Sequence, residues 1–144
     1  MDFICDVDGT VADLTHRRHY LDQKPKNWKM FYANISNDIP ILPVIETIQA
    51  LYVARHRIIF CTGRPEDYRA ETTGWLSQHV TQPKFLYMRT RNDFRDDATI
   101  KLELLQRIRS DGFDPRMAFD DRDRVVKMWR DQGLICAQVN EGNF

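Results

Sequence analysis

The sequence has 144 residues, which suits one domain of ordinary size and leaves little room for a second. Apolar residues make up 42% of it, enough to bury a core, and 21 basic residues balance 21 acidic ones. The formal charge is therefore zero and gives no overall reason to expect nucleic acid or a membrane surface as partner, so any such preference must come from a local patch. No apolar run approaches the ~20 residues of a membrane span, and no signal peptide is recognisable. We expect a soluble protein of the cytoplasm with no membrane partner.

The sequence contains three cysteines, at positions 5, 61 and 136. An odd number without a CxxC pair or a His/Cys cluster argues against both a disulfide framework and a zinc site. Each cysteine stands in an apolar run, so we expect all three to be buried as small hydrophobic residues.

Apolar segments follow one another in a regular order along the chain. Residues 3–7 read as a buried strand that runs into the polar turn Asp8-Gly9-Thr10. Residues 13–40 are polar and irregular, and we expect a cap insertion with a little helix there. Helical spacing then alternates with short, continuously apolar runs. The expected helices are about 43–56, 65–76, 100–108 and 123–133, and the expected strands are 58–61, 85–88, 117–119 and 135–139.

This alternation predicts the fold class. Continuously apolar strands between helices indicate a parallel sheet covered on both faces, here a Rossmann-like α/β sheet of about five strands. We expect one domain, with its core formed by residues 1–12 and 41–144 and its cap by about 13–40. Ligands bind at the carboxyl ends of the strands in such sheets. Those ends carry polar residues from distant parts of the chain, namely Asp6, Asp8, Thr62, Asp120 and Asp121.

Four carboxylates on one rim would repel one another unless a cation lies among them or some stay protonated. Mg²⁺ suits an all-oxygen site that shares a substrate phosphate, and the absence of His from these segments disfavours zinc. One carboxylate could attack phosphorus while its neighbour protonates the leaving group and then activates water. A Thr hydroxyl, the backbone N–H at Gly63 and a Lys could hold the phosphoryl oxygens.

These segments resemble the motifs of the haloacid dehalogenase-like phosphohydrolases. Residues 6–10, with the sequence DVDGT, resemble the first motif, and Thr62-Gly63-Arg64 resembles the second. Lys101 resembles the third-motif lysine, and Asp120-Asp121 the acidic fourth motif. The order and spacing also agree, over nearly the whole chain.

The resemblance implies a Mg²⁺-dependent phosphatase that forms an aspartyl-phosphate. Asp6 would be the nucleophile, Asp8 the general acid and base, and Thr62 and Lys101 the groups that hold the transferring phosphate. The implied metal ligands are Asp6, Asp8, Asp120 and Asp121.

A closer resemblance is to the 3′-phosphatase domain of phage polynucleotide kinase-phosphatases. It is carried by Asp96-Asp97 shortly before Lys101, by residues 120–130 and by residues 138–144. It implies a cytoplasmic protein, in the host cytoplasm if the source is a phage, with a separate kinase or ligase as partner. No GxxxxGK[ST] pattern occurs, which excludes a P-loop from these residues. The implied substrate-binding residues are Arg17, Gly63, Arg64 and Asp97, with Asp96 as an alternative to Asp97.

Several of these residues also have a plainer interpretation. Arg17, Arg64 and Asp97 could be solvated charges, and Lys101 could be an ordinary exposed helix lysine. The functional role is favoured for Lys101, because it lies off the apolar stripe of its helix and the core does not need it. Three aromatic residues of the insertion could stack on a nucleobase or form a small core beneath the cap, namely Trp28, Phe31 and Tyr32. For Trp75 and Trp129, we expect core packing.

Three functions remain open from the sequence. The first is a 3′-phosphatase of DNA or RNA ends, favoured by basic residues near the rim: Arg17, Arg18, Lys24, Lys26, Lys29, Arg89, Arg91 and Arg95. The second is a phosphatase of free nucleotides or other small phosphate esters, favoured by the zero net charge. The third is a non-catalytic domain that binds phosphorylated ends.

Overall fold

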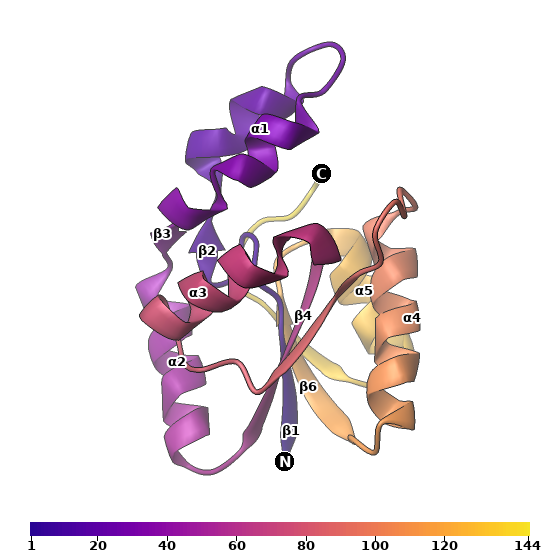
Figure 1. Cartoon of the computed structure of the whole chain (residues 1–144). Coiled ribbons are helices and arrows are strands. Elements are labelled where there is room, and N and C mark those ends of the chain that lie inside the picture. The colour runs from indigo at the N-terminus through magenta and orange to yellow at the C-terminus, as the bar shows by residue number, and fades with distance from the viewer.

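A parallel sheet of five strands forms the centre of the protein in the computed structural model, which describes all residues 1–144 (Figure 1). The strand order is β5-β4-β1-β6-β7, and every neighbouring pair is parallel. The strands are β1 (Asp2–Cys5), β4 (Arg57–Pro65), β5 (Phe85–Arg89), β6 (Pro115–Asp120) and β7 (Ile135–Gln138). The predicted parallel sheet is thus confirmed, with β1 at its centre.

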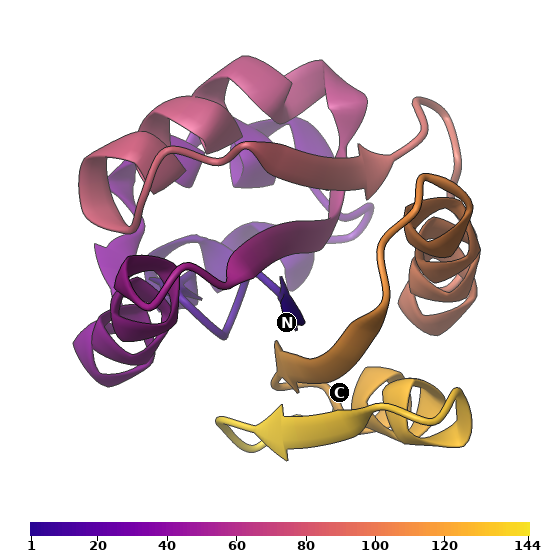
Figure 2. The same ribbon diagram turned by 90° about the horizontal axis from the view of Figure 1, so that it is seen from below.

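Helices cover both faces of this sheet, as the view along the strands in Figure 2 shows. The helices are α2 (Leu42–Val53) and α3 (Arg69–His79) on one face, and α4 (Asp97–Ser110) and α5 (Asp123–Asp131) on the other. Because successive strand residues point to opposite faces, Ile4 enters the core beneath α4 and α5, while Phe3 and Cys5 enter the core beneath α2 and α3. The continuous apolar runs are explained by these two cores.

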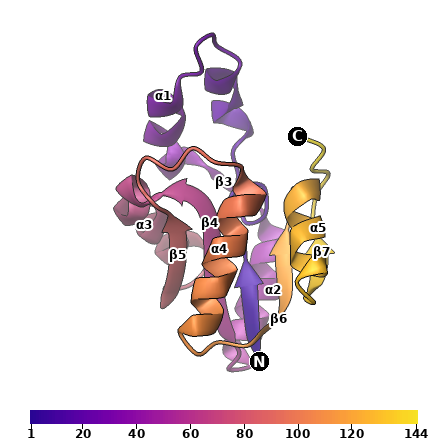
Figure 3. The ribbon, with the colours of Figure 1, turned by 90° about the vertical axis from the view of Figure 1, so that its right-hand side faces the viewer.

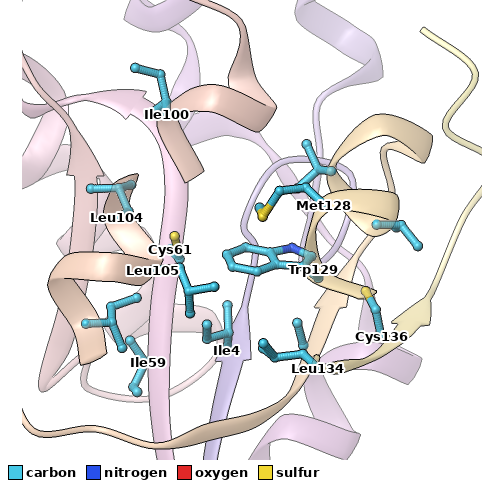
Figure 4. Packing of buried hydrophobic residues seen from close by; sticks show 14 residues of the cluster. Ile4, Ile59, Cys61, Ile100, Leu104, Leu105, Met128, Trp129, Leu134 and Cys136 are labelled. Carbon is cyan, nitrogen blue, oxygen red and sulfur yellow. The ribbon is translucent and has the colours of Figure 1, made fainter. Parts of the chain in front are cut away.

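The core beneath α4 and α5 is shown in Figure 4, with the indole of Trp129 among the side chains of strands and helices. Trp129 is fully buried, and Trp75 lies in the opposite core with 3% of its surface exposed. Both tryptophans therefore pack as predicted. All three cysteines are buried and free, also as predicted.

The cap lies beyond the carboxyl ends of the strands (Figures 1 and 3). It contains the short helices η1 (Thr15–Leu21), α1 (Trp28–Ala33) and η2 (Ile35–Asn37). A two-residue antiparallel ladder, between β2 (Ala12–Asp13) and β3 (Ile39–Pro40), joins its two ends to the core. Asn27 caps α1, since its Oδ1 accepts from the backbone N–H of Met30 at 3.1 Å.

Several boundaries differ from the sequence prediction: β1, for example, ends at Cys5 instead of Val7, and the differences at the end of β4 bear on the site. Strand β4, expected over residues 58–61, continues through Thr62 to Pro65 instead of ending at Cys61. Pro65 is extended, with ψ 149°, and a short 3-10 helix, η3 (Glu66–Tyr68), follows before α3 begins at Arg69. The expected helix start at Pro65 is thus wrong, because that residue still belongs to the strand. None of the helices combines the length and the apolar character needed to cross a membrane.

Candidate active site

The loop after β1 turns sharply and carries the first two acids. The Val7 carbonyl accepts hydrogen bonds from three successive N–H groups, those of Thr10, Val11 and Ala12, at 3.0 to 3.2 Å. Gly9 has φ +81°, in the left-handed region that favours glycine, and any Cβ there would collide with the carboxylate of Asp121. The DVDGT segment therefore folds against the end of β6.

Three carboxylates converge at this point. Oxygens of Asp6, Asp120 and Asp121 lie within 4.8 Å of one another, and all three residues are buried. Burial and the charges of Asp120 and Asp121 raise the pKa of Asp6 well above its usual value, although Lys101 lowers it. Burial and the charge of Asp120 also raise the pKa of Asp121, to about 6. The three acids therefore carry more negative charge than their surroundings balance.

Lys101 is the one ammonium group inside this cluster. Its Nζ lies 2.8 Å from Asp6 Oδ1 and 2.9 Å from Asp120 Oδ2, and the residue is only 2% exposed. Burial disfavours its charged form, but Asp120 and Asp6 outweigh burial and raise its pKa. The interpretation of Lys101 as an ordinary exposed helix lysine is therefore wrong.

Other donors fix the remaining carboxylate oxygens. Thr10 Oγ1 donates to Asp6 Oδ2 at 3.1 Å, and the indole N–H of Trp129 donates to Asp120 Oδ2 at 3.0 Å. Core packing explained Trp129 from the sequence, but its bond to Asp120 was not foreseen. Asp6, Asp120 and Asp121 form an all-oxygen, negatively charged set that fits Mg²⁺.

Asp8 lies in different surroundings from Asp6, two residues away. Its Oδ1 accepts from Arg17 Nη2 at 2.8 Å and from Arg64 Nη2 at 2.7 Å. Burial opposes ionisation of Asp8, but Arg64 and Arg17 outweigh it and lower its pKa to about 2. The family resemblance implied that Asp8 is one of the metal ligands. Its side chain is instead turned to the two arginines and lies outside the cluster of three acids.

Both arginines are completely buried, which excludes their interpretation as solvated charges. They share a second carboxylate, that of Asp38 in the cap. Arg17 Nε and Nη2 reach the carboxylate of Asp38 at 2.7 and 2.8 Å, and Arg64 Nη2 reaches it at 3.0 Å. Trp75 Nε1 also donates to the Asp38 carbonyl at 3.0 Å. This buried group of charges ties the cap to the core.

Asp38 was missed by sequence reasoning. It stands before Ile-Pro in an irregular polar segment, and nothing in that pattern distinguishes it from a surface acid. Arg17 and Arg64 were expected to contact substrate, but neither lines the cleft described below. They lie behind Asp8, and any effect that they have on substrate is exerted through it.

The end of β4 supplies the third part of the site. The Thr62 hydroxyl accepts from the Arg64 backbone N–H at 3.2 Å, which leaves its own hydrogen free to donate. A Cβ on Gly63 would collide with Asp97 Oδ1, so this strand end approaches α4 closely only because residue 63 is glycine. Arg89 joins the two segments, since its Nε donates to the Gly63 carbonyl at 2.8 Å and its Nη2 to Asp97 Oδ1 at 3.3 Å. Arg89 was foreseen only as one of several basic residues near the rim.

The structure distinguishes Asp97 from Asp96. Asp97 Oδ2 lies 3.7 Å from Lys101 Nζ and 3.8 Å from Arg122 Nη1. Asp96 instead caps α4 through the Ala98 N–H at 3.1 Å and pairs with Arg124 at 2.8 Å. Asp97 is therefore the acid that is connected to Lys101 and to the end of β6.

A cleft of about 810 Å³ lies between the cap and the carboxyl ends of the strands. Its lining includes Asp6, Asp8, Thr62, Lys101 and Asp121. The cap aromatics Trp28, Phe31 and Tyr32 all line the cleft, but Phe31 is buried and lies against the Arg17 guanidinium, whose carbon is 4.3 Å from the centroid of its ring. Residues from four distant segments thus meet at the bottom of one open cavity.

Comparisons with known proteins agree with this geometry. The family profile described as "Polynucleotide kinase PNKP phosphatase domain" matches residues 2–144. A protein of Autographa californica nuclear polyhedrosis virus, described as a bifunctional polynucleotide kinase/RNA ligase, is 31% identical over 130 residues, or 89% of this chain and 17% of the viral protein.

Solved structures extend the comparison. A chain in the Pnkp1/Rnl/Hen1 complex superposes with a TM-score of 0.86 at 31% identity, over 99% of this chain and 46% of that one. The class C acid phosphatase from Bacillus anthracis, with a TM-score of 0.66 and 15% identity, shares the fold alone. This chain thus spans less than half of the Pnkp1-complex chain and about a sixth of the viral relative. It belongs to the family of PNKP phosphatase domains and is a phosphatase of the haloacid dehalogenase-like type.

Proposed function

We propose that this protein is a Mg²⁺-dependent phosphomonoesterase that removes 3′-phosphates from polynucleotide ends through an aspartyl-phosphate on Asp6. The observation that carries the proposal is the position of the Asp6 carboxylate at the bottom of the cleft, beside Lys101 and the two acids at the end of β6. Family membership supports the phosphatase chemistry.

The cation site would be formed by Asp6, Asp120 and Asp121. A bound Mg²⁺ would neutralise charge on the transferring phosphoryl group and on the acids around it. It would also lower the pKa of Asp6, so that the nucleophile is ionised at neutral pH.

Protein groups would hold the phosphoryl oxygens from the other side. Thr62 has a free hydroxyl hydrogen, and Lys101 has three N–H bonds of which Asp6 and Asp120 accept two. Both can therefore donate to equatorial oxygens, where charge is concentrated in phosphoryl transfer. The Gly63 backbone N–H would add a third donor.

The chemistry would proceed in two displacements. One Asp6 carboxylate oxygen bonds to phosphorus while the ester P–O bond breaks, and the leaving 3′-oxygen takes a proton from Asp8. Water then attacks phosphorus and passes a proton to Asp8 while the bond between Asp6 and phosphorus breaks, which releases inorganic phosphate and restores the Asp6 carboxylate.

Asp8 must be protonated before the first displacement, although the two arginines favour its ionised form in the free protein. A phosphate dianion bound beside Asp8 would raise its pKa, because a second negative charge disfavours ionisation. Arg17 and Arg64 would then orient Asp8 toward the leaving oxygen.

The names of the relatives suggest the substrate class and partners. The viral relative is described as a kinase and RNA ligase, and another matching structure is that of a Pnkp1/Rnl/Hen1 RNA repair complex. We therefore favour RNA ends as substrate, and a kinase and a ligase as partners. A site for free nucleotides is the second candidate.

A substrate panel tests the proposal. It compares 3′- and 5′-phosphorylated oligonucleotides with nucleoside 3′- and 5′-monophosphates, each with Mg²⁺, and uses Asp6→Asn as the inactive control. We expect the 3′-phosphorylated oligonucleotide to have the highest kcat/KM. A higher kcat/KM for any mononucleotide would replace the proposal with the small-molecule function.

A further inference from the structure

Two aromatic side chains at the mouth of the cleft have no role in the chemistry described above. Phe94, in the loop between β5 and α4, is 89% exposed, and Trp28, at the start of α1, is 47% exposed. Both line the cleft that contains Asp6. In Figures 1 and 3, this loop and the cap both lie beyond the carboxyl ends of the strands.

The exposure of Phe94 is not that of a loosely held loop. Arg89 Nη1 donates to the carbonyl groups on both sides of Phe94, to Asp93 O at 3.1 Å and to Arg95 O at 2.7 Å. Arg95 is fixed in turn by two bonds to Glu103 on α4, at 2.6 and 2.8 Å. The backbone therefore holds a large apolar ring in water, which forfeits burial energy unless a ligand covers the ring.

The same Arg89 connects this loop to the catalytic residues. Its Nε donates to the Gly63 carbonyl, and its Nη2 to Asp97, as described above. Phe94 is thus held at a set position relative to the phosphate-binding end of β4.

Trp28 is supported in a similar way from the cap. Its ring stacks on Tyr32 with centroids 5.9 Å apart, and Tyr32 stacks on Tyr68 of the core at 4.8 Å. The planes of these two pairs differ by only 20° and 26°. The stack of three rings leads from the core to an aromatic side chain that is half exposed to the cleft.

Positive charge lines the cap side of the cleft, and Lys26 Nζ lies 5.8 Å from the centroid of the Trp28 ring. Arg18 and Lys29 line the cleft, and neither has a carboxylate within ion-pair distance. Supported aromatic rings beside free cations are the usual combination for single-stranded nucleic acid, in which bases stack on the rings and phosphates contact the cations.

We propose that Trp28 and Phe94 stack on the nucleobases next to the scissile phosphate and make the cleft selective for single-stranded ends. Bases inside a duplex already stack on their neighbours, so only an unpaired end offers a free base face to these rings. This inference rests on the proposed function, since it names the part of a polynucleotide that the site would read.

The first test changes the ring and the base separately. Phe94→Ala and Phe94→Tyr are compared with the control variant Val53→Ala. Val53 is exposed at the end of α2, just before β4 begins, and so lies away from the cleft at the other end of that strand. The substrates are a 3′-phosphorylated single strand of about ten nucleotides, the same strand with abasic residues at its last two positions, and p-nitrophenyl phosphate. Each variant is described by its kcat/KM on the strand divided by its kcat/KM on p-nitrophenyl phosphate.

We expect Phe94→Ala to lower this ratio about tenfold, because one base stacked on an aromatic ring contributes about that factor to binding. Phe94→Tyr and Val53→Ala should keep the parent ratio. On the abasic strand, the parent and Phe94→Ala should be equal, because the stacking partner is gone.

An undiminished ratio in Phe94→Ala would overturn the inference. So would an equal loss on the normal and abasic strands. If Phe94→Ala altered the sedimentation of the protein but left the kcat/KM ratio unchanged, Phe94 would belong to a protein–protein contact instead of a base-stacking site. Failure of the parent protein to cleave any 3′-phosphorylated strand, while it cleaves p-nitrophenyl phosphate, would refute the proposed function and not merely the stacking.

A second measurement tests Trp28 by fluorescence. Of the three tryptophans, Trp75 and Trp129 are buried, so Trp28 is the one that a ligand can reach. In the inactive Asp6→Asn variant, we expect the 3′-phosphorylated strand to quench tryptophan fluorescence and the abasic strand to quench it much less. Equal quenching by both strands, or quenching that persists in Trp28→Phe, would contradict stacking on this residue.

Discussion

Asp6 and Asp8 are two residues apart, yet they lie in groups of opposite electrostatic character. Around Asp6, three carboxylates face a single ammonium group, that of Lys101. Around Asp8, two carboxylates face two guanidinium groups, since Asp38 joins Asp8 in contact with Arg17 and Arg64. The first group has an excess of negative charge, whereas the charges of the second group are balanced.

This difference explains how two aspartates in one turn can have separate roles. The unbalanced group has an excess of negative charge that a bound cation would neutralise, and that cation would in turn attract a phosphate. The balanced group is already complete, so it can hold Asp8 in one orientation without a ligand. Environments that separate the behaviour of two carboxylates are the usual basis for assigning nucleophile and acid/base roles.

The largest expected effect comes from removing the Asp6 carboxylate. Asp6→Asn should lower turnover by on the order of a hundredfold or more, because the covalent route is lost. In the absence of divalent cations, the same change should raise the melting temperature, since it removes one of three mutually repelling acids. Turnover with p-nitrophenyl phosphate and thermal unfolding in EDTA measure the two effects. Residual turnover above about one per cent of the parent would exclude Asp6 as nucleophile.

Removal of divalent cations should also abolish activity. With excess EDTA we expect no measurable phosphate release, and Mg²⁺ should restore release and raise the melting temperature by relieving the repulsion among the acids. In Asp121→Asn, the thermal stabilisation by Mg²⁺ should be smaller. Full activity in EDTA would refute the metal site.

In the balanced group, a single substitution should destabilise the protein. Asp38→Asn leaves two buried guanidinium groups with one carboxylate, and should lower the free energy of unfolding by about 3–5 kcal/mol. Asp114→Asn is the matched control, because this exposed acid pairs with Arg116 at the surface and should contribute at most ~1 kcal/mol. Urea unfolding curves measure both, and equal losses would contradict the buried charge group.

The smallest effect concerns pH. In EDTA, the pKa of Asp121 is raised from 3.8 to about 6, so the folded protein binds more protons than the unfolded chain between these values. Stability from this group is present below about pH 4 and is lost as the pH rises through 6. The melting temperature of the parent should therefore fall relative to Asp121→Asn over that interval, and Mg²⁺ should remove the difference. Parallel curves in EDTA would contradict the unbalanced cluster.

Much of the fold and of the acid cluster was predictable. Apolar strands in a parallel sheet direct their carboxyl ends to one edge, so Asp6, Thr62 and Asp120 had to meet there once the strands were recognised. Lys101 was recognisable from its motif, although helical periodicity alone gave no sign that it would be buried.

The charge group around Asp8 was much less predictable. Burial of Arg17 and Arg64 depends on Asp38, and these three residues stand in different segments with no pattern that relates them. The direction of the Asp8 side chain, away from the acid cluster, likewise depends on those partners. Asp96 and Asp97 are equivalent in sequence, and only the start of α4 shows which one caps the helix and which one contacts Lys101.

The most direct test of the division between Asp6 and Asp8 uses Asp8→Ala with p-nitrophenyl phosphate, whose leaving group needs no proton. Without Asp8 to activate water, the phosphorylated protein should accumulate, and mass spectrometry of acid-quenched samples should find one phosphoryl group on the peptide that contains Asp6. Two results would contradict the assignment of Asp6 as nucleophile and Asp8 as acid and base. In the first, Asp8→Ala releases p-nitrophenol but carries no covalent phosphate. In the second, the phosphate is found on a peptide that does not contain Asp6.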